Sequence, residues 1–272
     1  MQHQTSATVP ALLVLLFNAV AAAQPHSGDV IVKLEAGRLI TGRLVQGSAS
    51  FPWQVAAATF GDTGIPGATF NPGYDSEIGA LPPSQPVGLT IRKALRAWDG
   101  QTFSAIPAQP TPPRLNIIKN NVTITTPVTD PGSCGVGDSL ILGIVNSTGK
   151  IHEHPAYQLV NPVEGVYLLE VELWLGQPGQ AASRPVSIVF NQDSGAFAQA
   201  VVWAEDRLGA PCYANCDDST GSPVLTANDF QCFLNRYASG ACEANCDGST
   251  GSPVLTANDF QCFLNAYAAG CP

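Results

Sequence analysis

The sequence has little charge and very little lysine. Charged residues make up 12% of the 272 residues, only four are lysines, and the formal net charge is -9. An acidic, lysine-poor surface repels the phosphates of nucleic acids and the headgroups of anionic lipids. We therefore expect no nucleic-acid partner and no binding to anionic membrane surfaces.

The sequence also lacks an apolar run long enough to cross a bilayer, which takes about 20 residues in a helix. Its clearest apolar stretch is residues 11–23 (ALLVLLFNAVAAA). This stretch ends in small residues, as a secretory signal peptide does, although no Lys or Arg precedes it. We expect residues 1–23 to be a signal peptide and the mature protein to be secreted, either extracellular or attached to the cell surface. An uncleaved buried strand or helix is the alternative.

Long helices are disfavoured because the chain contains 26 glycines and 22 prolines. The clearest strand, residues 166–175, alternates apolar side chains with Glu170 and Glu172, which we expect to face solvent. Residues 24–208 are therefore predicted to form a mainly β extracellular domain, an antiparallel β-sandwich or jelly roll. The expected strands are residues 30–34, 39–45, 53–60, 122–126, 140–146, 166–175, 186–191 and 200–204, with one helix over residues 87–98.

An internal repeat occupies the C-terminus. Residues 214–235 (ANCDDSTGSPVLTANDFQCFLN) recur with a period of 30 as residues 244–265 (ANCDGSTGSPVLTANDFQCFLN), and the two copies differ only at Asp218 and Gly248. Each copy has an oxygen-rich turn followed by an apolar stripe at helical spacing. Residues 209–272 are therefore predicted to form a separate, small α-helical domain of two repeats.

The turns carry a pattern suited to a hard cation. Asn245, Asp247 and Ser249 alternate, so that their side-chain oxygens can converge, and Asp259 stands at the head of the following helix. Val254 could add a carbonyl and Thr256 a hydroxyl or a bridging water. Oxygen ligands at alternating loop positions, closed by an acid, are typical of Ca²⁺ sites. The alternative is a disulfide-bonded turn whose acid only caps the helix.

Two tandem loop-helix repeats of this kind at an exported C-terminus resemble a dockerin domain, in a cysteine-rich bacterial subtype ending in Gly-Cys. The resemblance covers about a quarter of the chain and implies about two Ca²⁺ ions. The loops depart from the family pattern, with fifteen positions instead of twelve and Asn in place of the first Asp, so we expect weak binding, at about 10⁻⁴–10⁻³ M. The implied ligands are Asn215, Asp217, Ser219, Val224, Thr226 and Asp229 in the first repeat, and Asn245, Asp247, Ser249, Val254, Thr256 and Asp259 in the second.

Dockerins are non-catalytic modules that bind cohesin domains, so the resemblance implies a cohesin-like partner. Two nearly identical repeats present similar surfaces after a half-turn, and in dockerins this symmetry lets the partner bind in either of two orientations. The candidate contacts are Ala227, Asn228, Phe230 and Arg236 in the first repeat, and Ala257, Asn258 and Phe260 in the second.

Seven of the eight cysteines lie in the last quarter of the chain, which predicts a disulfide framework in a domain too small to bury much core. Bridging Cys216 to Cys232 and Cys246 to Cys262 would close loops of about fifteen residues, each contributing about 3 kcal/mol. The pairing of the other four is left open by the sequence. These four are Cys134, Cys212, Cys242 and Cys271, and a Cys212–Cys271 bond joining the ends of the domain is one arrangement.

The β domain offers weaker chemical signals. His152 and His154 would point the same way on a strand and could share a metal. No third ligand lies at a characteristic spacing in the sequence. Two histidines at the surface, or with their hydrogen bonds satisfied, are the simpler interpretation. Glu170 and Glu172, or Asp193 and Glu205, could form a glycosidase pair, although paired acids are common on strand faces. The sequence thus favours a non-catalytic binding or structural protein displayed through the tail. The alternative is a polysaccharide-active enzyme or carbohydrate-binding module on the same tail.

Overall fold

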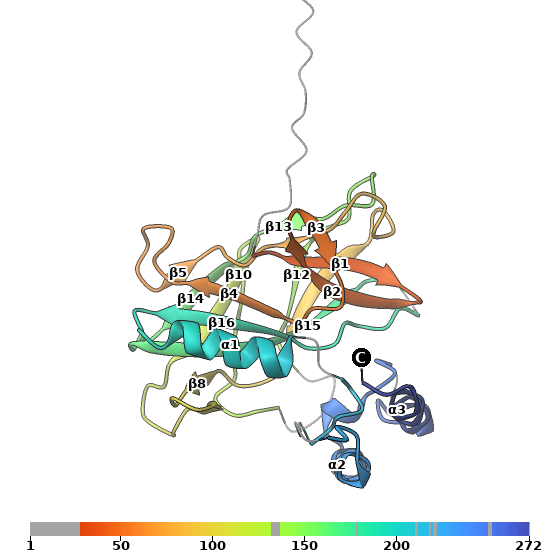
Figure 1. Cartoon of the computed structure of the whole chain (residues 1–272). Coiled ribbons are helices and arrows are strands. Elements are labelled where there is room, and N and C mark those ends of the chain that lie inside the picture. The colour runs from red at the N-terminus through yellow and green to blue at the C-terminus, as the bar shows by residue number, and fades with distance from the viewer. Residues whose placement is uncertain are drawn as a thin grey trace, which may run out of the picture.

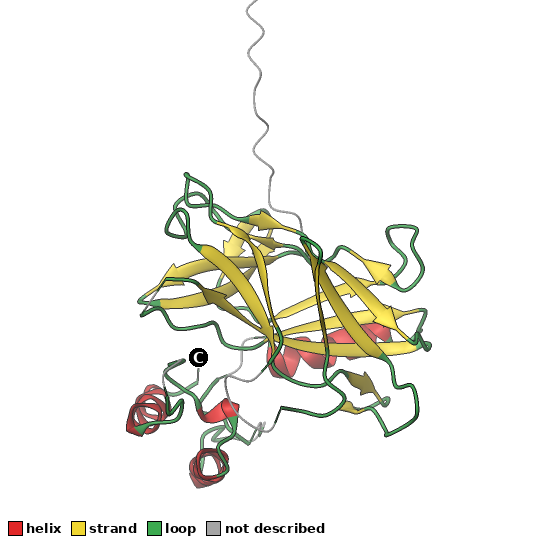
Figure 2. Cartoon of the chain, turned by 180° about the vertical axis from the view of Figure 1, so that it is seen from behind, coloured by secondary structure: helices red, strands yellow, loops and turns green. Residues whose placement is uncertain are grey.

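The computed structural model describes residues 28–131, 137–177, 179–209, 212–217, 219, 222–249 and 252–271. Its larger part is mainly β, with three sheets, and its C-terminal region contains three short helices (Figures 1 and 2). The strand bounds are β1 Val30–Glu35, β2 Arg38–Val45, β3 Ser48–Ser50, β4 Val55–Thr59, β5 Ala68–Thr69, β6 Tyr74–Asp75, β7 Pro86–Ile91, β8 Arg96–Trp98, β9 Phe103–Ala105, β10 Arg114–Lys119, β11 Val122–Thr125, β12 Ser139–Ile144, β13 His152–Glu153, β14 Ala156–Val160, β15 Gly165–Leu175 and β16 Val186–Gln192.

The three sheets have the strand orders β13-β6-β1-β2-β3, β11-β10-β14-β5 and β12-β7-β15-β16-β4, and β8 and β9 extend the third beside β15. Most pairs are antiparallel, but β1 pairs with β6 and β16 with β4 in parallel. The expectation of a purely antiparallel fold is therefore wrong. The mainly β class is confirmed, and the assignment to a sandwich or jelly roll stays a prediction.

Strand β15 contributes residues to two hydrophobic clusters, one on each of its faces. Tyr167, Leu169, Val171, Leu173 and Leu175 point into the main core, as the alternation predicts. On the opposite face, residues 166 and 168 are buried beneath helix α1 (Phe197–Leu208), which lies along β16 and β4 in Figure 1. The expectation that this face meets solvent is wrong, because α1 and the C-terminal region cover it.

Helix α1 replaces the strand expected over residues 200–204. Ala200 and Ala204, four residues apart, are fully buried against the sheet, so the apolar period of this segment is helical. Small side chains at these positions let the helix approach closely. A short apolar run of this kind does not distinguish strand from helix by pattern alone.

The helix expected over residues 87–98 is also wrong, since the segment forms β7 and β8. Val87, Leu89 and Ile91, spaced two residues apart, are fully buried in the main core, which is the strand period. Gly88 lies so close to the Trp174 ring that a Cβ there would clash with it. This segment is therefore held as a strand by its central place between β12 and β15.

The C-terminal region contains α2 (Ala227–Ala238), the 3₁₀ turn η1 (Cys242–Ala244) and α3 (Ala257–Ala269). Its own small core stacks Phe233 on Phe263, with ring centroids 4.2 Å apart. None of the helices in the described ranges is long and apolar enough to cross a membrane.

Candidate functional site

The two repeats begin their helices in the same way. The Thr226 and Thr256 side chains cap α2 and α3, and the carboxylates of Asp229 and Asp259 accept from the cap residues' own backbone N–H groups at 2.7 and 2.8 Å. Both aspartates have no exposed surface. Each helix therefore starts with a buried carboxylate aimed back at the loop before it.

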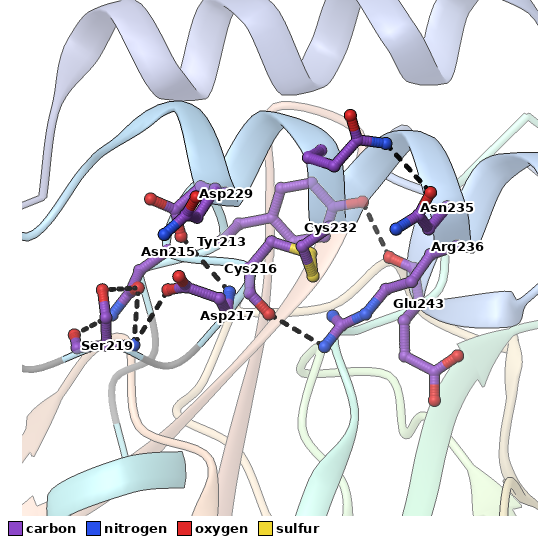
Figure 3. The surroundings of a disulfide bond; sticks show 12 residues. Tyr213, Asn215, Cys216, Asp217, Ser219, Asp229, Cys232, Asn235, Arg236 and Glu243 are labelled. Carbon is purple, nitrogen blue, oxygen red and sulfur yellow. Dashed lines mark hydrogen bonds between the residues drawn. A yellow bond between two sulfur atoms is a disulfide. The ribbon is translucent and has the colours of Figure 1, made fainter.

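The first loop gathers the ligands proposed for it. The Ser219 amide donates to Asn215 Oδ1 at 3.1 Å and to Asp217 Oδ1 at 3.0 Å, and the Ser219 hydroxyl donates to the Val224 carbonyl at 3.1 Å. The Asp217 amide donates to Asp229 Oδ1 at 3.2 Å. Figure 3 shows Asn215, Asp217, Ser219 and Asp229 gathered beside the disulfide of Cys216.

The second loop repeats this arrangement with one difference. Asp247 N–H donates to Asp259 Oδ1 at 3.1 Å, Ser249 N–H donates to Asp247 Oδ1 at 2.8 Å, and the Ser249 hydroxyl donates to the Val254 carbonyl at 3.1 Å. Asn245 Oδ1, however, is buried and accepts no hydrogen bond. A buried acceptor without a partner is costly and marks a place where a ligand atom or ion fits.

The acids of the second loop influence each other's ionisation. Burial raises the pKa of Asp259, and the nearby charge of Asp247 raises it further. Burial tends to raise the pKa of Asp247 as well, but hydrogen bonds from Ser249 outweigh burial and hold it below its ordinary value. Two carboxylates held this close favour a bound cation, which would offset their repulsion.

Three disulfides hold the region together: Cys216–Cys232, Cys246–Cys262 and Cys212–Cys271. The first two tie each loop to its following helix, and the third joins the two ends of the region. Cys242 is also disulfide-bonded, and Cys134 lies outside the described residues. Three disulfides are consistent with an extracellular protein.

The residues expected to contact a partner fall into two groups. Those at the helix starts are exposed in both repeats. Phe230 and Phe260 are instead partly buried and pack against the small core of the region, with their ring centroids 5.9 Å apart. Arg236 donates to the Cys216 carbonyl at 2.9 Å (Figure 3). The exposed members are Ala227, Asn228, Ala257 and Asn258.

Arg38 of β2 makes the corresponding bond in the second repeat. Its Nη2 donates to the Cys246 carbonyl at 2.8 Å, the bond that Arg236 makes to Cys216 in the first repeat. The position matching Arg236 thirty residues later is Ala266. The β domain therefore supplies the guanidinium that the second repeat lacks. Sequence reasoning missed Arg38, and the signal for it was this Arg-to-Ala difference between nearly identical repeats.

Other charged contacts complete the junction. Lys93 Nζ lies 3.3 Å from Glu170 and 3.0 Å from Glu243, joining β15 to the C-terminal region. The Arg184 guanidinium lies 4.3 Å above the Tyr213 ring. Burial lowers the pKa of Arg184 to about 10.

These groups line a cleft of about 180 Å³ between the two parts of the chain. Glu172 also lines it and lies 3.3 Å from Arg92. Burial raises the pKa of Glu172, although Arg92 and Arg38 oppose the shift. Glu170 and Glu172 are thus ion-paired at the junction rather than standing as a pair of solvent-exposed acids.

Comparisons with known proteins assign no family. No protein-family model matches the chain, and no curated protein matches it. Among solved structures, the CooA pilin subunit from enterotoxigenic Escherichia coli aligns over 56% of this chain and 97% of its own length, with 11% identity and a TM-score of 0.27. A likeness this low carries no inference about function.

Proposed function

We propose that this chain is a secreted, non-catalytic binding or structural protein whose C-terminal region is a dockerin-like calcium module. In this proposal the module docks a cohesin-like partner and so displays the β-rich domain outside the cell. The observation that carries it is the pair of loops in which side-chain oxygens gather at a buried aspartate, with Asn245 Oδ1 buried and unbonded in one of them.

The donor set fits calcium better than a softer metal. Each loop offers carboxylate, amide, hydroxyl and carbonyl oxygens and no nitrogen or sulfur ligand, which suits a hard cation. Asp229 and Asp259 each accept hydrogen bonds from backbone N–H groups. An ionised carboxylate has about four lone-pair positions, so each can also bind a cation. The residues that would hold the ions are the twelve named above. A bound ion would neutralise the paired acids and order the loop.

The exposed helix starts support docking through either repeat. Ala227 and Asn228 are exposed in the first repeat, and Ala257 and Asn258 in the second, although the second repeat is the one bonded to Arg38. The contact with the β domain therefore leaves both candidate surfaces accessible. Of the acids considered for the polysaccharide alternative, Glu170 and Glu172 are ion-paired at the junction, and Glu205 is ion-paired with Arg43.

Calorimetric titration of Ca²⁺ into the oxidised, chelator-stripped full chain tests the calcium part. We expect about two sites with dissociation constants of about 10⁻⁴–10⁻³ M. Asp217→Ala and Asp247→Ala should each remove one site, and the double variant should remove both. The control is Asp206→Ala, which deletes an exposed carboxylate on α1 and should change nothing. No heat at millimolar Ca²⁺ would refute the calcium site.

Binding to a panel of cohesin domains, with and without Ca²⁺, tests the docking part. If either repeat can dock, Asn228→Lys alone and Asn258→Lys alone should each leave binding within a few-fold, and the two together should abolish it. Calcium binding without any cohesin binding would keep the metal sites and reject the partner. Loss of binding from one single change would reject the two-orientation mode.

A further inference from the structure

A second group of potential metal ligands lies in the β-rich domain, away from the C-terminal loops. Asp29 precedes β1, and His152 and His154 lie on and just after β13. Strand β6 stands between β1 and β13 in their sheet, pairing Val30 with Tyr74 on one side and Asp75 with His152 on the other. One carboxylate oxygen and one ring nitrogen of each histidine consequently lie within 4.8 Å of one another.

Asp29 is a buried carboxylate with one unsatisfied oxygen. Its Oδ1 accepts from the Gly73 amide at 2.9 Å, whereas its Oδ2 is buried with no hydrogen-bond partner. His154 Nε2 lies 3.7 Å from that oxygen, too far for a hydrogen bond. A buried carboxylate oxygen without a hydrogen bond is costly, so the site favours a positive ion next to Oδ2.

Both histidine rings are held by their Nδ1 atoms. His152 Nδ1 donates to Asp75 Oδ2 at 2.9 Å, and His154 Nδ1 donates to the Phe70 carbonyl at 3.0 Å. A carboxylate and a carbonyl oxygen can only accept, so Nδ1 of each ring is the donor. In the neutral form of such a ring the lone pair is on Nε2, which is the atom that can bind a metal. A ring N–H bonded to a carboxylate or carbonyl is the usual support of a metal-binding histidine.

The support around the rings is itself buried and charged. Asp75 has no exposed surface, and its Oδ1 accepts from the Ser76 amide at 2.6 Å and lies 3.4 Å from Lys150 Nζ. Position 73 accommodates only glycine, because a Cβ there would clash with the His154 ring. The ring orientations are therefore set by the fold around them.

We propose that Asp29 Oδ2, His152 Nε2 and His154 Nε2 form a binding site for a divalent transition-metal ion, with Zn²⁺ as the ion that this donor set fits. Two imidazole nitrogens and one carboxylate are common zinc ligands, and three protein ligands leave a position for water or a further ligand. Zinc bonds of about 2.0–2.2 Å would place the donors about 3.4 Å apart. The site must therefore contract on binding, and His154, whose side chain is 26% exposed, is less enclosed than Asp29.

This inference does not depend on the proposed calcium module. The C-terminal loops offer oxygen ligands to a hard cation, whereas this site offers two nitrogens to a softer one. The two sites should therefore be separable by the choice of ion.

Titration of Co²⁺, a spectroscopic substitute for Zn²⁺, into the full chain with Ca²⁺ in millimolar excess tests the site. We expect one equivalent of Co²⁺ to bind with visible d–d absorption, which Zn²⁺ abolishes and added Ca²⁺ does not. Asp29→Asn, His152→Gln and His154→Gln should each weaken binding at least tenfold. Asp75→Asn removes support for His152 and should weaken it by about 10–100-fold.

Glu153→Gln is the matched control, because Glu153 lies between the two histidines but pairs with Lys119 at 2.6 Å and should leave Co²⁺ affinity unchanged. Circular dichroism checks that each variant is folded, and the partly exposed His154 is the position where folding is least at risk. The site is overturned by the absence of one-equivalent binding, by displacement with Ca²⁺, or by unchanged affinity in both histidine variants.

Discussion

Replacing Gly248 with alanine should loosen the contact between the second repeat and the β domain. Gly248 has a φ of +68°, and a Cβ there would lie 2.9 Å from Arg38 Nη2 and 3.1 Å from the Ala181 Cβ. The guanidinium is the flexible end of its side chain and can move away. It would then lose its 2.8 Å bond to the Cys246 carbonyl.

The cost has two parts. Alanine in left-handed backbone costs about 1–2 kcal/mol wherever it is placed. A hydrogen bond from a charged group contributes about 1.5–3 kcal/mol, part of which is recovered as Arg38 regains water. We therefore expect Gly248→Ala to lower the free energy of unfolding by about 2–4 kcal/mol, and Arg38→Ala by about 1.5–3 kcal/mol.

Gly240 provides the matched control. Its φ is +74°, and a Cβ there would meet nothing within 4 Å, so Gly240→Ala should cost only the backbone strain of about 1–2 kcal/mol. In the Arg38→Ala background, Gly248→Ala should fall to the same cost. The double-mutant cycle between Arg38 and Gly248 should thus give a coupling of about 1–2 kcal/mol.

Urea unfolding of the oxidised protein at fixed Ca²⁺ measures these values. All four tryptophans lie in the β-rich domain, so their fluorescence reports on that domain, and far-UV circular dichroism adds the helices. Equal costs for Gly248→Ala and Gly240→Ala, or the same cost of Gly248→Ala with and without Arg38, would refute the reasoning.

Two further predictions concern the junction and the disulfides. Burial tends to raise the pKa of Glu243, but the Lys93 ammonium outweighs burial and holds the pKa below its ordinary value, so their bridge stabilises at neutral pH and is lost as the pH falls below about 4.5. A Lys93→Met/Glu243→Gln cycle in urea should give about 0.2–1 kcal/mol near neutral pH and nothing near pH 3, and a coupling that grows on acidification would contradict this. Replacing Cys212 and Cys271 by serine opens a loop with a sequence separation of 59 and should cost up to about 4 kcal/mol in thermal or urea unfolding, whereas an unchanged midpoint would count against it.

The two repeats have nearly the same sequence, but only the second accepts a hydrogen bond from Arg38 of the β domain. They are identical over 22 aligned positions except at Asp218 and Gly248, and they diverge again at Arg236 and Ala266. Gly248 approaches Arg38, and Ala266 stands where Arg236 stands in the first repeat. The differences therefore coincide with the contact that only the second repeat makes with the β domain.

The local features of this protein followed from its sequence. Alternation along residues 166–175 placed Tyr167 and its neighbours in the core, because the period of a strand is independent of what covers it. The repeated pattern before Asp229 and Asp259 located the loops and the helix starts, because capping is decided within a few residues. The spacing of the cysteines likewise predicted the disulfides Cys216–Cys232 and Cys246–Cys262.

Only the tertiary structure decided the features that join distant segments. The segment 87–98 contains strands because β7 lies between β12 and β15 and β8 pairs with β15 and β9. The Glu170 face was covered by elements that follow it in the chain. Arg38 reaches Cys246 across 208 positions, and Asp29 reaches His154 across the sheet. No local pattern records such pairings, because they arise when sheet order and packing bring side chains together that the sequence keeps far apart.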